Sequence, residues 1–232
     1  MPVFYDLHLH SCLSPCGDMD MTPCNIVGMA ALKHLDIVAL TDHNSCKNCP
    51  AFLRAAKGYS LKAVAGMELC TSEEIHVVCL FNTLEKAMRF DEYVSGKIPP
   101  IQNNAGIFGR QVIMDGQDRE IGEENRLLIT AADISVTDVT ELMEQFGGFC
   151  FPAHIDRSSY SILSSLGSIP PECGFSCYEL ADIKRQKNLL TLHPALKEME
   201  MLKNSDAHYL ADISEPEQAL REGKLLQYLT ES

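Results

Sequence analysis

The segment Y-D-L-H-L-H-S-C at residues 5–12 decides the fold, because apolar and polar residues alternate in it as they do in a half-buried β-strand. Side chains two positions apart in a strand point to the same face. His8 and His10 therefore present both imidazoles on one side, where they can bind one cation. Cysteines and acids follow directly, in L-S-P-C-G-D-M-D at residues 13–20. The stretch fits a strand that carries two imidazoles, a cysteine-based metal knuckle, or the first piece of a larger metal site.

Strand-like and helix-like segments alternate outward from this first strand. Expected strands lie at 3–9, 36–41, 61–69, 75–81, 148–153, 177–180 and 202–205, and expected helices at 25–35, 51–57, 84–95, 135–146, 158–166, 189–199 and 215–229. Thr22 and Pro23 are typical of a helix start. Repeated βα units predict one α/β domain over residues 1–232, with a parallel sheet or barrel and helices outside. The segment 96–130 is irregular, and we expect it to form a hairpin or lid over a site.

The positions of the histidines point to one shared site. Of the eight histidines, six lie in or at the end of an expected strand: His8, His10, His43, His76, His154 and His208. The carboxyl ends of barrel strands meet at one rim, so these side chains would converge there. Any one histidine alone is more simply a core or surface residue, whereas six at strand ends predict metal binding. His34 and His193 lie outside this pattern and are expected to be structural.

Composition narrows the class of protein. The formal net charge of −13 argues against a broad grip on the backbone of long nucleic acid. No apolar run is long enough to span a membrane and no export signal is visible, so we expect a cytoplasmic protein whose ten cysteines are mostly buried thiols or ligands. Cys46 and Cys49 form a CxxC, but no second CxxC completes a four-sulfur zinc site. A redox or iron–sulfur protein built on this pair is therefore a weaker alternative.

The motifs together resemble the PHP (polymerase and histidinol phosphatase) family. The resemblance is carried by D-L-H-L-H-S at 6–11, T-D-H-N at 41–44, G-M-E at 66–68, E-I-H at 74–76, P-A-H-I at 152–155 and S-D-A-H at 205–208. Ordered motifs over this length are far more specific than a single HxH. The resemblance implies a distorted (β/α)7 barrel whose cleft holds two or three divalent ions, for which imidazole and carboxylate donors suit Mn, Zn or Fe.

The resemblance also implies metal ligands at nine positions. One ion would be held by His8, His10, Glu68 and Asp206, a second by Asp18, His43 and His208, and a third by Glu68, His76 and His154. Asp18 is selected because the family's aspartate lies five residues before a Thr-Pro proline, and Asp20 is the alternative. Asp6 and Asp42 are candidates to orient histidine rings as acceptors.

Clustered divalent ions suit phosphate ester hydrolysis, because they neutralise phosphoryl oxygens and lower the pKa of bound water toward about 7. The expected nucleophile is metal-bound water held by His8, His10, Glu68 and Asp206. Arg157 is a candidate phosphate clamp, and its alternative is a surface arginine. We expect a small phosphorylated substrate, either a phosphate ester or a nucleotide, rather than long nucleic acid or a membrane. The alternatives are a metal-dependent amidohydrolase, which also starts with HxH on a barrel strand, and a non-catalytic metal-stabilised regulatory module.

Overall fold

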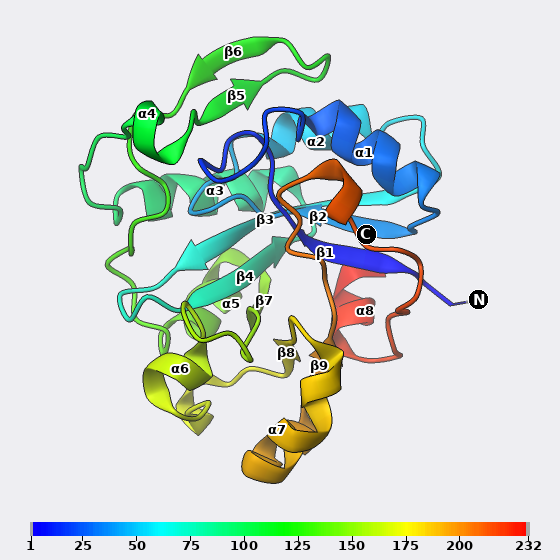
Figure 1. Ribbon diagram of the computed structural model, residues 1–232, viewed down its shortest axis with the longest axis vertical. Coiled ribbons are helices and arrows are strands. Elements are labelled where there is room, and N and C mark those ends of the chain that lie inside the picture. Colours follow the sequence, from blue (N-terminus) through cyan, green and yellow to red (C-terminus); the bar gives the residue numbers. More distant parts are fainter. Residues whose placement is uncertain (1, 231–232) are drawn as a thin grey trace.

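The computed structural model describes residues 2–230 and shows a curled sheet surrounded by helices (Figure 1). Five strands form the main sheet in the order β1-β2-β3-β4-β7. Their bounds are β1 Tyr5–Leu9, β2 Ile37–Leu40, β3 Lys62–Cys70, β4 His76–Phe81 and β7 Phe149–Pro152. The pairs β1–β2 and β2–β3 are parallel, so the carboxyl ends of these three strands lie at the same edge.

Two further strands, β8 Cys177–Glu179 and β9 Glu200–Leu202, form a separate two-stranded parallel sheet that continues the curl of the main sheet toward a barrel. The Ile155 N–H, just beyond β7, donates to the Glu179 carbonyl at 2.9 Å and links β7 to β8. On the other side, the His10 N–H donates to the Ala207 carbonyl at 3.0 Å, which links the end of β1 to the chain that follows β9. The fold is the distorted α/β barrel that the sequence predicts.

Strand β4 is the main departure from a parallel barrel, because it runs antiparallel to both β3 and β7. Cys70 pairs with His76, so only residues 71–75 connect the two strands. A parallel connection needs a crossover of a dozen or more residues, whereas a short turn joins antiparallel strands. The expectation of a uniformly parallel sheet is therefore wrong at β4.

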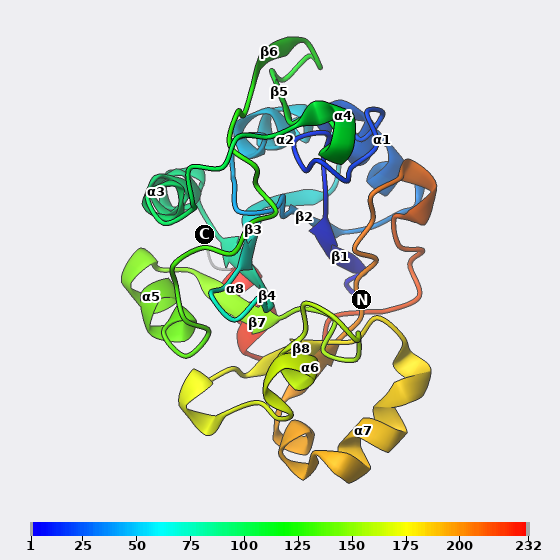
Figure 2. The ribbon, with the colours of Figure 1, turned by 60° about the vertical axis from the view of Figure 1, so that its left-hand side comes forward.

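Helices surround the sheet, as Figure 2 shows. They are α1 Pro23–Leu32, α2 Cys49–Ala55, α3 Leu84–Ser95, α5 Val139–Phe146, α6 Ile162–Leu166, α7 Gln186–Leu192 and α8 Lys224–Thr230. α1 begins where Thr22 and Pro23 predict it, with the Thr22 side chain as cap. The expected helix 189–199 is divided at Pro194, after which only a 3-10 turn follows. The final helix is shorter than expected, because Pro216 and Gly223 interrupt the residues before it.

Apolar side chains pack on both faces of the sheet and hold the strand ends in place. The larger cluster lies between the sheet and the helices α1, α2, α3 and α5, and it includes the buried rings of Phe52 and Phe90. The second cluster includes Leu7 and Phe151 and is covered by Leu225 of α8. A strand that is packed on both faces is rigid, so the side chains at its end have fixed positions.

The segment 96–130 forms α4 Ala105–Phe108 and a hairpin of β5 Val112–Met114 and β6 Glu120–Glu123, so the expected hairpin is confirmed. It lies above α1 and α2 in Figure 1. The Val112 N–H donates to the Cys12 carbonyl at 2.9 Å, and the side chain of Asn48 bonds the backbone of Val112 and Met114. The hairpin is therefore anchored on the loop that follows β1, and its action as a lid stays a prediction.

No helix within residues 2–230 is both long and apolar enough to cross a membrane.

All ten cysteines are free thiols. The Cys46 and Cys49 sulfurs are buried 3.2 and 3.5 Å from the Gly66 carbonyl, and burial raises the pKa of the Cys46 thiol well above its usual value. Buried thiols of this kind are unreactive, so the geometry gives the redox alternative no support.

Candidate metal centre

The loop after β1 positions the histidines of the opening motif. Asp42, which follows β2, accepts hydrogen bonds from the Ser11 N–H and from the hydroxyls of Ser11 and Ser14, each at 2.7 Å. Ser14 Oγ in turn lies 3.0 Å from His10 Nδ1 and leaves Nε2 to face the interior. Asp42 therefore acts on His10 through Ser14, and the expectation that it contacts a ring directly is wrong.

Asp6, the other expected ring acceptor, also has a different role. Its carboxylate accepts hydrogen bonds from the backbone N–H groups of Ser205 and Ser214, at 3.1 and 2.9 Å. These bonds fix the loop after β9, which carries Asp206. Asp6 thus positions a candidate ligand through the backbone, and the expectation that it orients a histidine ring is wrong.

Glu68, near the end of β3, lies at the centre of the site. Its carboxylate is buried, and five imidazole nitrogens lie within 3.3 Å of it, from His8, His10, His43, His76 and His154. These contacts are not all hydrogen bonds. His43 Nδ1 and Glu68 Oε2 are 2.9 Å apart, yet neither atom has a hydrogen-bond partner within the described chain. Buried polar atoms are almost always partnered, so this pair indicates a missing ligand between them.

Asp206, in the loop after β9, brings a second carboxylate to the site. Its Oδ1 lies 3.1 Å from His10 Nε2 and 3.4 Å from His8 Nε2. The backbone φ is +53° at Asp206 and +30° at His154, a region that costs a residue with a Cβ about 1–3 kcal/mol. Strain of this kind gathers at functional sites, where the surrounding structure holds a side chain in place.

Glu179, the last residue of β8, is a functional residue that sequence reasoning missed. Both of its oxygens contact His8 Nδ1, at 3.0 and 3.1 Å, and so turn His8 Nε2 toward the site. The same carboxylate accepts hydrogen bonds from the His154 N–H at 3.0 Å and from the Asn204 side chain at 2.7 Å. The sequence does carry a signal for Glu179, because it is an acid within the apolar run C-Y-E-L at 177–180, and a buried charge needs partners.

Within residues 2–230, three groups of donor atoms are close enough to hold an ion. Within each group, the donor atoms lie within 4.8 Å of one another: His8, His10, Glu68 and Asp206; His10, His43 and His208; and His43, Glu68 and His76. We call these seven side chains, together with His154, the histidine cluster. Its donors are imidazole nitrogens and carboxylate oxygens, which suit Zn, Mn or Fe. The groups share members, so the arrangement fits more than one ion.

The structure brings together eight of the nine expected ligands but not Asp18. Asp18 is half-buried, and its carboxylate accepts a hydrogen bond from the Asp20 N–H at 2.8 Å. Asp20 itself is exposed. Neither acid belongs to a donor group among the residues from 2 to 230. Cys16, in the same loop, belongs to none of these donor groups either, but its Sγ lies 3.1 Å from His208 Nε2.

Charges within the cluster shift the pKa values of its members in opposite directions. Burial lowers the pKa of His10, but the carboxylates of Asp206 and Glu68 outweigh it and raise the pKa to about 9. Burial raises the pKa of Glu68, but the surrounding imidazoles, His76 first among them, lower it well below its usual range. Burial and the charge of His10 together lower the pKa of His208 to about 3. Protons and metal ions therefore compete for the same donors.

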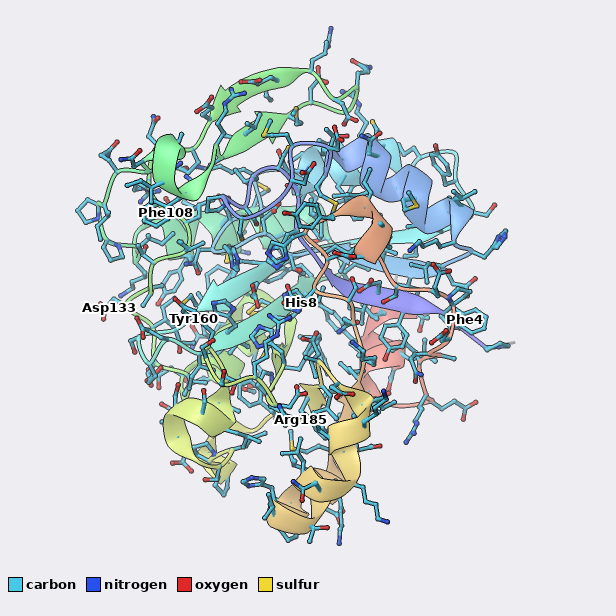
Figure 3. The ribbon with its side chains drawn as sticks, viewed as in Figure 1. Phe4, His8, Phe108, Asp133, Tyr160 and Arg185 are labelled. Atoms are coloured by element: carbon cyan, nitrogen blue, oxygen red, sulfur yellow. The ribbon has the colours of Figure 1, made fainter. Side chains whose placement is uncertain are left out.

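A small cavity of about 140 Å³ opens onto the cluster. Arg157, Ser159 and Tyr160 line it beside the histidines. Arg157 Nη1 lies 2.7 Å from Asp206 Oδ2, and the Arg157 side chain is 46% exposed. The Tyr160 ring stacks on His76 with centroids 4.7 Å apart. In Figure 3, the labelled His8 lies near the centre of the molecule and Tyr160 lies to its left.

Comparison with known proteins identifies the family. A sequence profile of the PHP domain matches residues 6–158, which is more than half of the chain. The chain belongs to the PHP domain family. Members of this family are metal-dependent hydrolases that bind several divalent ions. The histidine cluster of this PHP domain contains donors of the kind that such ions need.

Two proteins similar to this PHP domain are matched over only about half of their own length. The uncharacterized protein MJ1587 of Methanocaldococcus jannaschii is 30% identical over 98 residues, which are 38% of this chain and 57% of the relative. The lesion-specific endonuclease EndoQ of Pyrococcus furiosus has a TM-score of 0.66 at 20% identity, covering 90% of this chain and 49% of EndoQ. A second Endonuclease Q structure holds a 27-mer duplex with an abasic lesion at its active site. This chain thus spans about half the length of these proteins.

Two other similar structures match along most of their length. A candidate metal-dependent phosphoesterase of Bifidobacterium adolescentis has a TM-score of 0.64 at 16% identity, covering 97% of this chain and 95% of the other. An amidohydrolase of Chromobacterium violaceum with bound sulfate has a TM-score of 0.62 at 17% identity, covering 93% and 92%. At these identities the likeness establishes a shared fold.

Proposed function

We propose that this PHP domain is a phosphoesterase that hydrolyses a small phosphate ester or a nucleotide. The observation that carries the proposal is the buried Glu68 carboxylate, with five imidazole nitrogens within 3.3 Å and an unpartnered oxygen. A set of nitrogen and oxygen donors around a bridging carboxylate is suited to adjacent divalent ions.

Different donor groups would hold different ions. His8, His10, Glu68 and Asp206 would hold one ion, and the groups around His43 would hold others. Divalent ions bound there supply a water of lowered pKa and neutralise the oxygens of a phosphoryl group. The chain itself keeps the donors in place, because Glu179 and Ser14 fix the rings of His8 and His10.

The rim of the cavity supports a phosphate-bearing substrate. Arg157 is half-exposed at the mouth, so its guanidinium can offer two parallel N–H groups to phosphate oxygens. Tyr160 is 44% exposed and presents a ring face beside Arg157 to the rest of the substrate. The cavity of about 140 Å³ is small beside the roughly 300–1,000 Å³ of sites that enclose a drug-sized ligand. The reacting phosphate would enter, and a base or sugar would remain at the rim.

A nucleic acid substrate is the second candidate. The similar EndoQ is a lesion-specific endonuclease, so the fold accommodates DNA chemistry and the charge argument against nucleic acid does not exclude it. Tyr160 could stack one base at the rim, and such stacking is worth about 1–3 kcal/mol. The net charge of −13 opposes contact with a long backbone, so a short strand or a single nucleotide is favoured.

The test is a hydrolysis screen of the chain loaded with Mn²⁺, Zn²⁺ or Fe²⁺. The substrates are p-nitrophenyl phosphate, nucleotides, sugar phosphates, a short oligonucleotide, a duplex with an abasic site and a panel of N-acyl amides. We expect metal-dependent phosphate release from small esters, and loss of that release in Glu68→Gln. Cleavage of amides alone would establish the amidohydrolase alternative. A fully loaded chain that cleaves none of the substrates would favour the regulatory module.

A further inference from the structure

We propose that Cys16 is a metal ligand of this PHP domain, and that its sulfur serves the second ion together with His43 and His208. The inference rests on the metal dependence of the proposed function but concerns a residue outside the expected ligand set. Cys16 replaces Asp18 as the donor that the loop after β1 contributes.

The first argument is the position of the sulfur. Cys16 Sγ lies 3.1 Å from His208 Nε2, a ring that shares a donor group with His43. These two imidazoles belong, with His10, to the one donor group that lacks a carboxylate. Three imidazoles leave the fourth position of a tetrahedral ion open. The Cys16 thiolate would fill that position and supply a negative charge.

The second argument is an independent sign that a ligand is missing beside this group. His43 Nδ1 is buried and has no hydrogen-bond partner among the described residues, and the same holds for the facing Glu68 Oε2. An ion between His43 Nδ1 and Glu68 Oε2 explains both orphaned atoms and identifies His43 as a metal ligand.

The third argument is that the backbone holds Cys16 in this position although its side chain is exposed. The Gly17 N–H donates to the Ser14 carbonyl at 2.8 Å, and the Asp18 N–H donates to the His208 carbonyl at 2.9 Å. A Cβ at Gly17 would come within 2.4 Å of the Ser11 carbonyl oxygen, so the turn accepts only glycine there. The bond from Asp18 ties this turn to the residue whose ring contacts the sulfur.

The geometry also explains why Asp18 is not the donor. Its side-chain oxygen is engaged by the Asp20 N–H at 2.8 Å, and only its backbone reaches His208. Cys16 would bind as a thiolate and release its proton to solvent. A thiolate is a soft ligand, so this ion would be Zn²⁺, Fe²⁺ or Co²⁺ in preference to Mn²⁺.

The test uses Co²⁺ as the probe on the full chain, with absorption spectroscopy and metal analysis after dialysis. We expect the wild type to show a near-ultraviolet sulfur-to-cobalt charge-transfer band. Cys16→Ser should lose this band and retain one ion fewer per chain. Cys16→Asp should also lack the band but keep the ion, because a carboxylate replaces the thiolate. The matched controls are Cys24→Ser, a half-buried thiol outside the cluster, and Asp18→Asn, and both should keep the band and the ion.

The outcomes separate this inference from the proposed function. A band of full strength in Cys16→Ser would overturn it, as would an ion that is lost in Asp18→Asn but kept in Cys16→Ser. If the loaded wild type releases phosphate but shows no sulfur band, the Cys16 assignment fails and the phosphoesterase stands. If the wild type binds no cobalt at all, both the metal centre and this inference are refuted. Circular dichroism and thermal unfolding confirm that each variant is folded.

Discussion

Replacing Glu179 with glutamine tests whether the carboxylate behind His8 controls metal binding. The wild-type carboxylate contacts His8 Nδ1 with both oxygens and accepts one further hydrogen bond on each, from His154 and Asn204. Every contact is made by a donor. A glutamine has one carbonyl oxygen and one NH2 group, so one of these donors must then face another donor.

The structure predicts two separate effects of Glu179→Gln, one on the free energy of unfolding and one on metal affinity. A buried donor left without an acceptor costs about 1–3 kcal/mol, and this loss appears in the free energy of unfolding of the metal-free protein. In addition, the glutamine orients the His8 ring less firmly, which lowers the metal affinity of the protein. Removing a group that orients a ligating histidine typically lowers metal affinity by about 10–100-fold. That change corresponds to about 1.4–2.8 kcal/mol of binding free energy.

The assay combines calorimetric Mn²⁺ titration with urea unfolding of metal-free and loaded protein. The control is Glu200→Gln on β9, whose carboxylate contacts the Cys177 sulfur and no histidine. We expect Glu179→Gln to lose affinity and to show a smaller stabilisation by metal, while the control changes neither. Wild-type affinity in Glu179→Gln would refute the role of this carboxylate, and so would an equal loss in the control.

The remaining predictions concern ligands, pH and substrate. His10→Ala should lose bound metal and hydrolytic activity but keep its circular dichroism spectrum. His34→Ala, outside the cluster, should keep the metal, the activity and the spectrum. A fully active His10→Ala would contradict the assignment. In the metal-free protein, burial lowers the pKa values of His10 and His43, yet neighbouring carboxylates raise both to about 9. Because these folded-state values lie above the usual 6.5, the stability that they contribute is complete below pH 6.5 and is lost as pH rises through 9, which urea unfolding over this range will show. Metal affinity should rise over the same interval, by up to about tenfold per pH unit for each displaced proton, and calorimetry in buffers of different ionisation enthalpy will count the protons. Arg157→Ala should lower kcat/KM for a phosphate ester by about tenfold, mainly through KM, since the half-exposed guanidinium is partly screened by solvent. The control Arg119→Ala, at an exposed position, should match the wild type. Equal effects in the two variants would remove Arg157 from the substrate site.

The fold could be predicted from sequence where local pattern decides it. Alternating residues at 5–9 and the Thr22-Pro23 start indicate β1 and α1 directly. The reversal of β4 was missed, although the short connection at 71–75 carries the signal for it. The boundaries of the last helices also differed, because Pro194 and Gly223 end or delay helices that apolar spacing alone would continue.

The site was predictable to the extent that strand ends place side chains. Residues at strand ends, such as Glu68 and His154, have positions fixed by sheet register, so motif spacing suffices to bring them together. Loops are different, since the number of turns between His10 and α1 decides which donor reaches the cluster. Counting from a proline selects Asp18, whereas successive turns place Cys16 at His208. Glu179 was missed because it belongs to no motif and acts through the ring of another residue.

The histidine cluster concentrates unfavourable energy that a bound ion can relieve. Without metal, the buried Glu68 and His43 keep unpartnered polar atoms, and each such atom costs about 1–3 kcal/mol. His154 and Asp206 add backbone strain of about 1–3 kcal/mol each. The packed strands on which these residues sit prevent the side chains from turning away to find other partners. The rigidity that makes the metal-free arrangement costly is therefore the same property that keeps the donors in place for an ion, and the metal-free chain should be the less stable form.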